Sequence, residues 1–271
     1  MTEACGIIAG AGSFPFHVAR EAKRQGLKVI VLGIAGWVDP TLAAHADVYE
    51  EIAVGQIGQL ITTLKTHQTR CAIMAGKVTK EVLFDSRVCF DADALLLLSQ
   101  VKEYSVNTVL GALAARLAQD GVELLDSSTF LKENLCPPGV LTQRKPTSAE
   151  QEDMRLGAQA ARQMAELDIG QTVVVKGKVI VAVEALEGTD VAIARAGQLA
   201  GKGCVVVKVA SPKQDMRFDL PILGPKTVET ALAAGVGCLA VEAGKTLLLD
   251  RETLISNANA AQLAIVGLEL S

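Results

Sequence analysis

The chain has 271 residues and a formal net charge of −4, and half of its residues are hydrophobic while only 3% are aromatic. The acidic balance argues against nucleic-acid binding, which usually needs a basic face, and no apolar run reaches the roughly 18 residues that span a bilayer. The length exceeds what one core comfortably fills, which predicts two domains. The aliphatic-rich composition is typical of parallel sheets covered by helices, so we predict an α/β protein.

The cysteines indicate a reducing compartment. They lie far apart, mostly inside apolar runs, and form no C-x-x-C pair. We therefore predict buried free thiols rather than disulfides or a zinc site. The N-terminus enters a strand-like run without a basic start or a cleavage-site pattern, so the expected location is the cytoplasm.

The N-terminal half alternates between strands and helices. Cys5–Ala9 and Lys28–Leu32 read as strands, and the residues between them have the spacing of an amphipathic helix. This βαβ unit predicts a parallel sheet with right-handed connections. The pattern continues with a helix over 57–67, a strand over 71–75 and two helices within 91–119.

Breakers in "CPPG" and "RKPT" interrupt this pattern and predict a linker. We expect an N-terminal parallel-sheet domain over 1–130, the linker over 131–148, and a C-terminal α/β domain with antiparallel elements over 149–271. The elements predicted after the linker are a helix over 149–167, a hairpin around 176–178, a helix over 190–199, a strand over 204–209, a helix over 227–234, a second hairpin in "CLAVEAGKTLLLD" and a closing helix over 251–264.

Glycines and lysines follow several predicted strands. "GAGSFP" follows the first strand, and there the backbone at Gly10, Gly12 and Ser13 could approach a phosphate or a sugar. A dinucleotide site is disfavoured because Pro15 replaces the third glycine of that motif, and a structural turn is the plain alternative. Lys77 and Lys208 stand near strand ends, where open α/β sheets bind ligands, although a solvated lysine explains each equally well.

The block "EGTD" joins the first predicted hairpin to the next helix. Thr189 or Asp190 would be a good helix cap, and capping alone could explain the residue choice. The functional alternative is that Gly188, Thr189 and Asp190 face a ligand at the start of that helix.

The segment "KQDMRFDLPILGPKT" is the sharpest departure from the core-like composition. If it is extended, Asp215, Arg217 and Asp219 alternate and share one face. Lys213 and Arg217 suit phosphate oxygens, while aspartates suit Mg²⁺. These residues predict metal-assisted phosphoryl chemistry with Asp219 or Asp215 as ligand or base, against the alternative of a salt-bridged surface loop.

Three blocks carry a resemblance to a known family: "GIIAGAGSFP", "VEALEGTD" and "QDMRFDLPILGPKT". In their order and spacing over nearly the whole chain, they resemble the magnesium-dependent UDP-2,3-diacylglucosamine pyrophosphatase family of lipid A biosynthesis. The resemblance implies hydrolysis of UDP-2,3-diacylglucosamine to UMP and 2,3-diacylglucosamine 1-phosphate, lipid X. It also implies an N-terminal Rossmann-like domain and a C-terminal α/β domain that enclose the substrate, with Mg²⁺ as cofactor and the essential aspartate carried onto Asp219, or onto Asp215 as second choice.

Two other functions stay open at this point. One is a carrier that holds the lipid nucleotide sugar without cleaving it, and the other is a nicotinamide-dependent oxidoreductase. The expected partner is the lipid nucleotide-sugar substrate and not a nucleic acid; a transient contact with the inner membrane surface and a homodimer also stay open.

Overall fold

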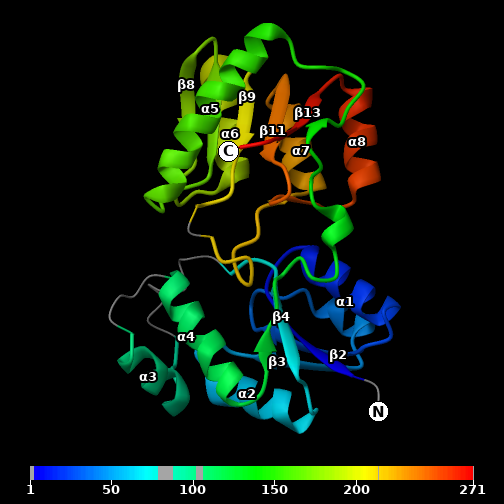
Figure 1. Cartoon of the computed structure of the whole chain (residues 1–271), viewed down its shortest axis with the longest axis vertical. Helices are drawn as coiled ribbons and strands as arrows, with labels where there is room; N and C mark the ends of the chain where they lie inside the picture. The colour runs from blue at the N-terminus through cyan, green and yellow to red at the C-terminus, as the bar shows by residue number, and fades with distance from the viewer. Residues whose placement is uncertain (1–2, 79–87, 102–105, 213, 271) are drawn as a thin grey trace. The chain divides into compact units, whose positions relative to one another are not determined.

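The computed structural model of the chain describes residues 3–78, 88–101, 106–212 and 214–270 (Figure 1). Its contacts divide the chain into two compact units. Unit 1 consists of Met1–Leu131 together with Asp215–Asp219, and unit 2 of Lys132–Gln214 together with Leu220–Ser271. The short segment Asp215–Asp219 thus belongs by its contacts to the unit that ends far earlier in the sequence.

Unit 1 is a parallel sheet between helices, as the βαβ pattern predicts. Its strand order is β3-β2-β1-β4-β5, and every pairing is parallel. The helices α2 and α4 pack on one face with the core cluster around Leu64 and Leu117, while α1 lies on the other side of the sheet (Figure 1). The elements are β1 (Ala4–Ala9), α1 (Phe14–Arg24), β2 (Lys28–Ile34), η1 (Pro40–His45), β3 (Val48–Ile52), α2 (Ile57–Thr66), β4 (Cys71–Ala75), α3 (Ala92–Ser99), α4 (Val106–Gln119) and β5 (Glu123–Leu124).

Unit 2 is a mixed sheet with helices on both faces. Its order is β6-β13-β11-β9-β7-β8; the three strands β13, β11 and β9 are parallel, and the outer pairings are antiparallel. The elements are η3 (Lys132–Asn134), β6 (Gly139–Val140), α5 (Ser148–Glu166), β7 (Thr172–Lys176), β8 (Val179–Val183), α6 (Thr189–Ala200), β9 (Val205–Lys208), β10 (Ile222–Leu223), α7 (Pro225–Ala233), β11 (Cys238–Glu242), β12 (Leu247–Leu248), α8 (Arg251–Ala260) and β13 (Ala264–Leu268). Residues 132–148, predicted as a linker, belong to this unit, where β6 pairs with β13.

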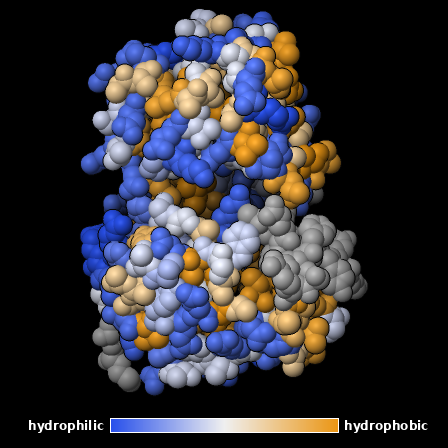
Figure 2. Space-filling model, turned by 180° about the vertical axis from the view of Figure 1, so that it is seen from behind, coloured by the Kyte–Doolittle hydropathy of each residue, from blue (hydrophilic) through white to orange (hydrophobic). Residues whose placement is uncertain are grey.

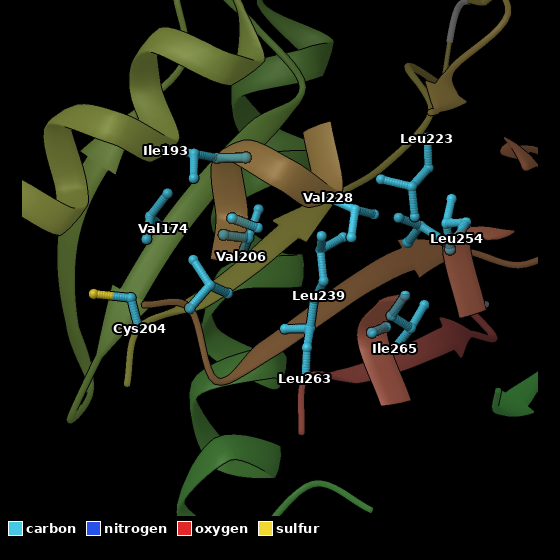
Figure 3. Packing of buried hydrophobic residues seen from close by; sticks show 14 of the residues in the cluster. Val174, Ile193, Cys204, Val206, Leu223, Val228, Leu239, Leu254, Leu263 and Ile265 are labelled. Carbon is cyan, nitrogen blue, oxygen red and sulfur yellow. The ribbon is translucent and has the colours of Figure 1, made fainter. Parts of the chain in front are cut away.

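Alternate strand residues divide the core of unit 2 into two layers. The side chains of Val174, Val206 and Leu239 point toward α6, α7 and α8 (Figure 3). Their neighbours Val173 and Val207 point to the opposite face and pack against the small side chains of α5. Because successive strand side chains face opposite ways, a sheet covered on both sides needs continuous apolar runs, and the sequence has them.

Two predictions for the C-terminal half are wrong. "CLAVEAGKTLLLD" is not a hairpin: β11 is an inner strand of the six-stranded sheet, whereas β12 pairs with β10 in a separate two-stranded parallel sheet. The closing helix ends at Ala260, and Ala264–Leu268 forms β13. The first error arises because a short apolar run does not reveal which strand it will pair with, and the second because periodicity alone does not tell whether such a run is a strand or part of a helix.

The helix α5 begins with a capping box. The Thr147 hydroxyl accepts from the Glu150 amide at 3.2 Å, and the Glu150 carboxylate accepts from the Thr147 amide at 2.8 Å. Arg144 donates to the same carboxylate at 2.7 Å. These contacts join the segment before the helix to its first turn and satisfy amides that the helix itself leaves unpaired.

The structure tests the predictions about membrane-spanning segments and about the cysteines. No helix within the described ranges is long and apolar enough to cross a membrane, and hydrophilic residues are spread over the face shown in Figure 2. All six cysteines are free thiols, as predicted, and four of them are buried. The prediction of burial is wrong for Cys89, which is exposed.

Candidate functional site

In unit 1, two glycine loops meet at the carboxyl edge of the sheet. They follow the neighbouring strands β1 and β4, and their backbones pair: the Ala11 amide donates to the Lys77 carbonyl and the Lys77 amide to the Ala11 carbonyl, both at 2.9 Å. A Cβ on Gly76, where φ is +92°, would lie 2.7 Å from the carbonyl carbon of Gly10. Close approach of two backbones therefore explains these glycines.

The same edge presents the start of α1. The Gly10 amide donates to the Ala75 carbonyl at 2.8 Å, so it serves the loop pairing. Gly12 and Ser13 follow as exposed residues at the first turn of the helix, and Lys77 is exposed as well. An anion placed here would meet the helix N-terminus and a nearby cation.

The segment Asp215–Asp219 is attached to this edge by Ser127, which lies shortly after β5. The Ser127 amide donates to the Met216 carbonyl at 2.9 Å. Its hydroxyl lies 2.8 Å from both the Met74 carbonyl in β4 and the Arg217 carbonyl. Phe218 packs against the apolar cluster beneath the sheet edge. The segment in which the sequence predicts phosphoryl chemistry is therefore held at the edge where α/β sheets bind ligands.

The segment is a turn, and the prediction of an extended strand with three charges on one face is wrong. The amides of Phe218 and Asp219 both donate to the Asp215 carbonyl, at 3.1 and 3.0 Å. Residues spaced by four in such a turn lie on the same side. The turn thus brings the backbone positions of Asp215 and Asp219 together, whereas alternation along a strand would have separated them.

Arg217 forms a bidentate ion pair with the Asp215 carboxylate. The Arg217 Nε lies 2.9 Å from Oδ1 and its Nη2 lies 2.6 Å from Oδ2. The hydrogen bonds from this side chain hold the pKa of Asp215 below its ordinary value, against a smaller opposing effect of burial. Asp215 is consequently a carboxylate whose two oxygens are already engaged. Lys213, the other predicted cation of this block, lies outside the described residues.

In unit 2, the start of α6 gathers a second polar group. Gly188 precedes the helix with φ of +85°, a conformation that favours glycine. Thr189 accepts a hydrogen bond from the Lys208 ammonium at 3.0 Å. The structure thus brings together two residues that the sequence singled out separately. The Asp190 carboxylate instead accepts from the Thr227 hydroxyl at 2.8 Å and joins α6 to α7.

Sequence reasoning missed Glu184. The Thr189 hydroxyl donates to its Oε1 at 2.8 Å, and the residue is only 8% exposed. The available signal was a carboxylate directly after an apolar strand, in the same block as "EGTD". Glu187, the first residue of that tetrapeptide, instead forms an ion pair with Arg195 at 2.7 Å.

The donors in unit 1 suit a metal that is shared with a substrate. Within the described ranges no three or more His, Cys, Asp or Glu side chains are grouped to hold a metal ion. Mg²⁺ does not need such a group, because it commonly binds one or two carboxylates together with phosphate oxygens and water. Asp219 of the turn at 215–219 fits that pattern, whereas both oxygens of Asp215 are engaged by Arg217.

Comparison with known proteins covers nearly the whole chain. Models of the LpxI N-terminal domain and the LpxI C-terminal domain match residues 4–134 and 137–266. The chain is 28% identical over 275 residues to the UDP-2,3-diacylglucosamine pyrophosphatase LpxI of Caulobacter vibrioides, covering 97% of each protein.

Similarity to solved structures is weak. The biotin carboxylase of Campylobacter jejuni is 14% identical, with 72% of this chain and 42% of that one covered and a TM-score of 0.29. The glycinamide-RNase-transformylase T of Mycobacterium tuberculosis is 16% identical, with 68% and 44% covered and a TM-score of 0.23. These scores support no inference about fold or function. The family models, which match both halves in order, do: the chain belongs to the LpxI family.

Proposed function

We propose that this chain hydrolyses the pyrophosphate bond of UDP-2,3-diacylglucosamine in lipid A biosynthesis. The observation that carries the proposal is the match of both LpxI domain models in order along the chain, with a relative of that activity aligned over 97% of its length. Water replaces the bridging oxygen on one phosphorus, and the products are UMP and 2,3-diacylglucosamine 1-phosphate.

Asp219 is the carboxylate that we assign to the reaction. It belongs to the turn that Ser127 and Phe218 attach to the carboxyl edge of the unit 1 sheet. Asp215 in the same turn is engaged by Arg217 through both of its oxygens, so we assign it the role of fixing Arg217. Asp219 would orient the attacking water and accept its proton.

The diphosphate needs positive charge around it. Lys77 at the sheet edge of unit 1, Arg217 in the turn and Lys208 in unit 2 are the described cations that we assign to this role, with Lys213 from the sequence. Gly12 and Ser13 would offer backbone donors at the start of α1. Gly188 and Thr189 form the corresponding start of α6.

We assign Mg²⁺ to Asp219 together with substrate phosphate oxygens, which fits the donors of the turn. When bound, the ion would polarise a phosphoryl oxygen and stabilise the charge that develops on it. The free cysteines support a cytoplasmic location, because reducing compartments keep thiols unpaired.

The test is UMP release from UDP-2,3-diacylglucosamine with Mg²⁺ and with EDTA. The wild type should release UMP only with the metal. Asp219→Asn should lose at least about 100-fold in kcat, as expected when a general base is removed, and Asp215→Asn should lose less. Wild-type protein that binds the substrate but releases no UMP with Mg²⁺ would refute hydrolysis and support the carrier.

A further inference from the structure

A row of polar side chains crosses the face of the unit 2 sheet that packs beneath α6. Thr172 of β7 lies opposite Lys208 of β9, and the Glu184 amide donates to the Thr172 carbonyl at 2.9 Å where β8 ends. Two residues away along the same strands, Val174 of β7 and Val206 of β9 belong to the core beneath α6. Strand alternation puts the polar row on that same face, next to the start of α6.

Chemistry fixes the direction of the two hydrogen bonds that join Thr189 to Lys208 and to Glu184. A lysine ammonium can only donate and a carboxylate can only accept. The Thr189 hydroxyl, at 3.0 Å from Lys208 Nζ and 2.8 Å from Glu184 Oε1, must therefore accept from the first and donate to the second. Thr189 is thus a neutral link between a buried cation and a buried anion, each only 8% exposed.

The burial of Glu184 lowers the stability of the fold. The second carboxylate oxygen of Glu184, Oε2, is buried and has no hydrogen-bond partner among the described residues. An unpaired buried oxygen on a charged group is strongly unfavourable, and an apolar residue of similar size would fill the position at less cost. Glu184 is therefore costly to stability where it lies, next to a lysine, and a functional role explains this residue better than packing does.

We infer that Glu184, acting through Thr189, positions the Lys208 ammonium to bind the diphosphate of the substrate; this rests on the proposed function. A lysine side chain has four flexible carbons and holds no fixed orientation by itself. The directed link from Lys208 to Thr189 to Glu184 restricts its ammonium to one location before the substrate arrives. Glu184 is a positioning residue in this scheme and does not contact the reacting atoms.

The experiment compares Glu184→Met, Thr189→Val and the double variant in UMP release and in UDP binding by calorimetry. Each single variant should lower kcat/KM and UDP affinity by about 10- to 100-fold, the range for a hydrogen bond to a charged group. The double variant should lose no more than the singles, because both substitutions break one link. Thr189→Ser, which keeps the hydroxyl, should recover most of the loss.

Urea unfolding distinguishes a positioning role of Glu184 from a purely structural one. The double variant should unfold at no lower urea concentration than Thr189→Val alone, because it also removes the stranded carboxylate. Glu187→Gln, in the same block but paired with Arg195, is the matched control and should keep wild-type kcat/KM.

Two results would overturn the inference: a Glu184→Met protein within about twofold of wild type in both readouts, or losses that multiply in the double variant. If the wild type binds UDP without releasing UMP, the proposed function fails while the UDP measurements still decide the role of Glu184. A wild type that does not bind UDP overturns the inference as well.

Discussion

Replacing Ser127 with alanine should release the segment Asp215–Asp219 from the sheet edge of unit 1. The Ser127 side chain is 2% exposed, and its hydroxyl lies 2.8 Å from the carbonyls of Met74 and Arg217. It is the polar side-chain link between β4 and the turn that we assign to catalysis. The backbone contact from the Ser127 amide to Met216 remains in the variant, so the segment is weakened and not deleted.

The Ser127 hydroxyl has one proton and lies near two carbonyls, so it donates one hydrogen bond at a time, and this sets the size of the expected loss. One hydrogen bond contributes about 0.5 to 1.5 kcal/mol, and a buried acceptor left unpaired adds to the loss. We expect about 1 to 2 kcal/mol against the docked turn, equivalent to about 5- to 30-fold in its docking equilibrium. The fall in kcat/KM for UMP release should reach up to that factor, and urea unfolding should show a similar loss of free energy.

Ser128→Ala is the matched control. Ser128 is equally buried, at 2% exposure, but its hydroxyl donates to the Asp126 carboxylate at 2.6 Å within the turn after β5. It should lose comparable stability while keeping kcat/KM within about twofold of wild type. Equal losses of activity in the two variants would refute the reasoning, because the effect would then follow general destabilisation.

Two further predictions concern stability. Gly76→Ala should lower the free energy of unfolding by about 2 to 4 kcal/mol in urea titrations, because its φ of +92° and the adjacent backbone leave no room for a Cβ. Gly121→Ala, at φ of +79° with nothing within 4 Å, should cost only about 1 kcal/mol, and equal costs would contradict the steric argument. Burial raises the pKa of Glu150, but the hydrogen bonds from Arg144 and the helix start outweigh it and keep the pKa below its ordinary value. Ionised Glu150 therefore contributes its full stabilisation above the unfolded pKa of about 4.3, and this stabilisation is lost as the pH drops through the lower folded pKa. Glu150→Gln should weaken the pH dependence of the melting temperature between about pH 5 and 3. An unchanged slope of melting temperature against pH would exclude this role.

Much of the fold could be predicted from local pattern. The strand Cys71–Ala75 is found as predicted, and the helix predicted over 149–167 is α5, whose buried side includes Met154, Ala158, Ala161 and Ala165. These elements carry their own signal, since apolar spacing reports which side of an element is buried. The edge strand Val48–Ile52 was missed because it is only partly buried and includes Tyr49 and two glutamates.

The sequence predicted which segments contribute to the candidate site, but not how their side chains contact one another. The sequence identified the 215–219 block and the "VEALEGTD" block by their unusual density of charge and turn residues. It could not show that Arg217 engages Asp215 in a turn, or that Glu184 is connected to Lys208 through Thr189. Those relations depend on side chains that are brought together by strand pairing and by helix packing.

The sequence by itself determined the α/β class, most helices and strands, and the family, because periodicity and contiguous motifs are local properties of the chain. Only the tertiary structure decided that β12 pairs with β10 and that Asp215–Asp219 joins unit 1. The same holds for the buried link from Glu184 to Lys208. Pairing partners and buried polar contacts depend on the free energy of the whole packed unit, in which residues distant in sequence exclude water together.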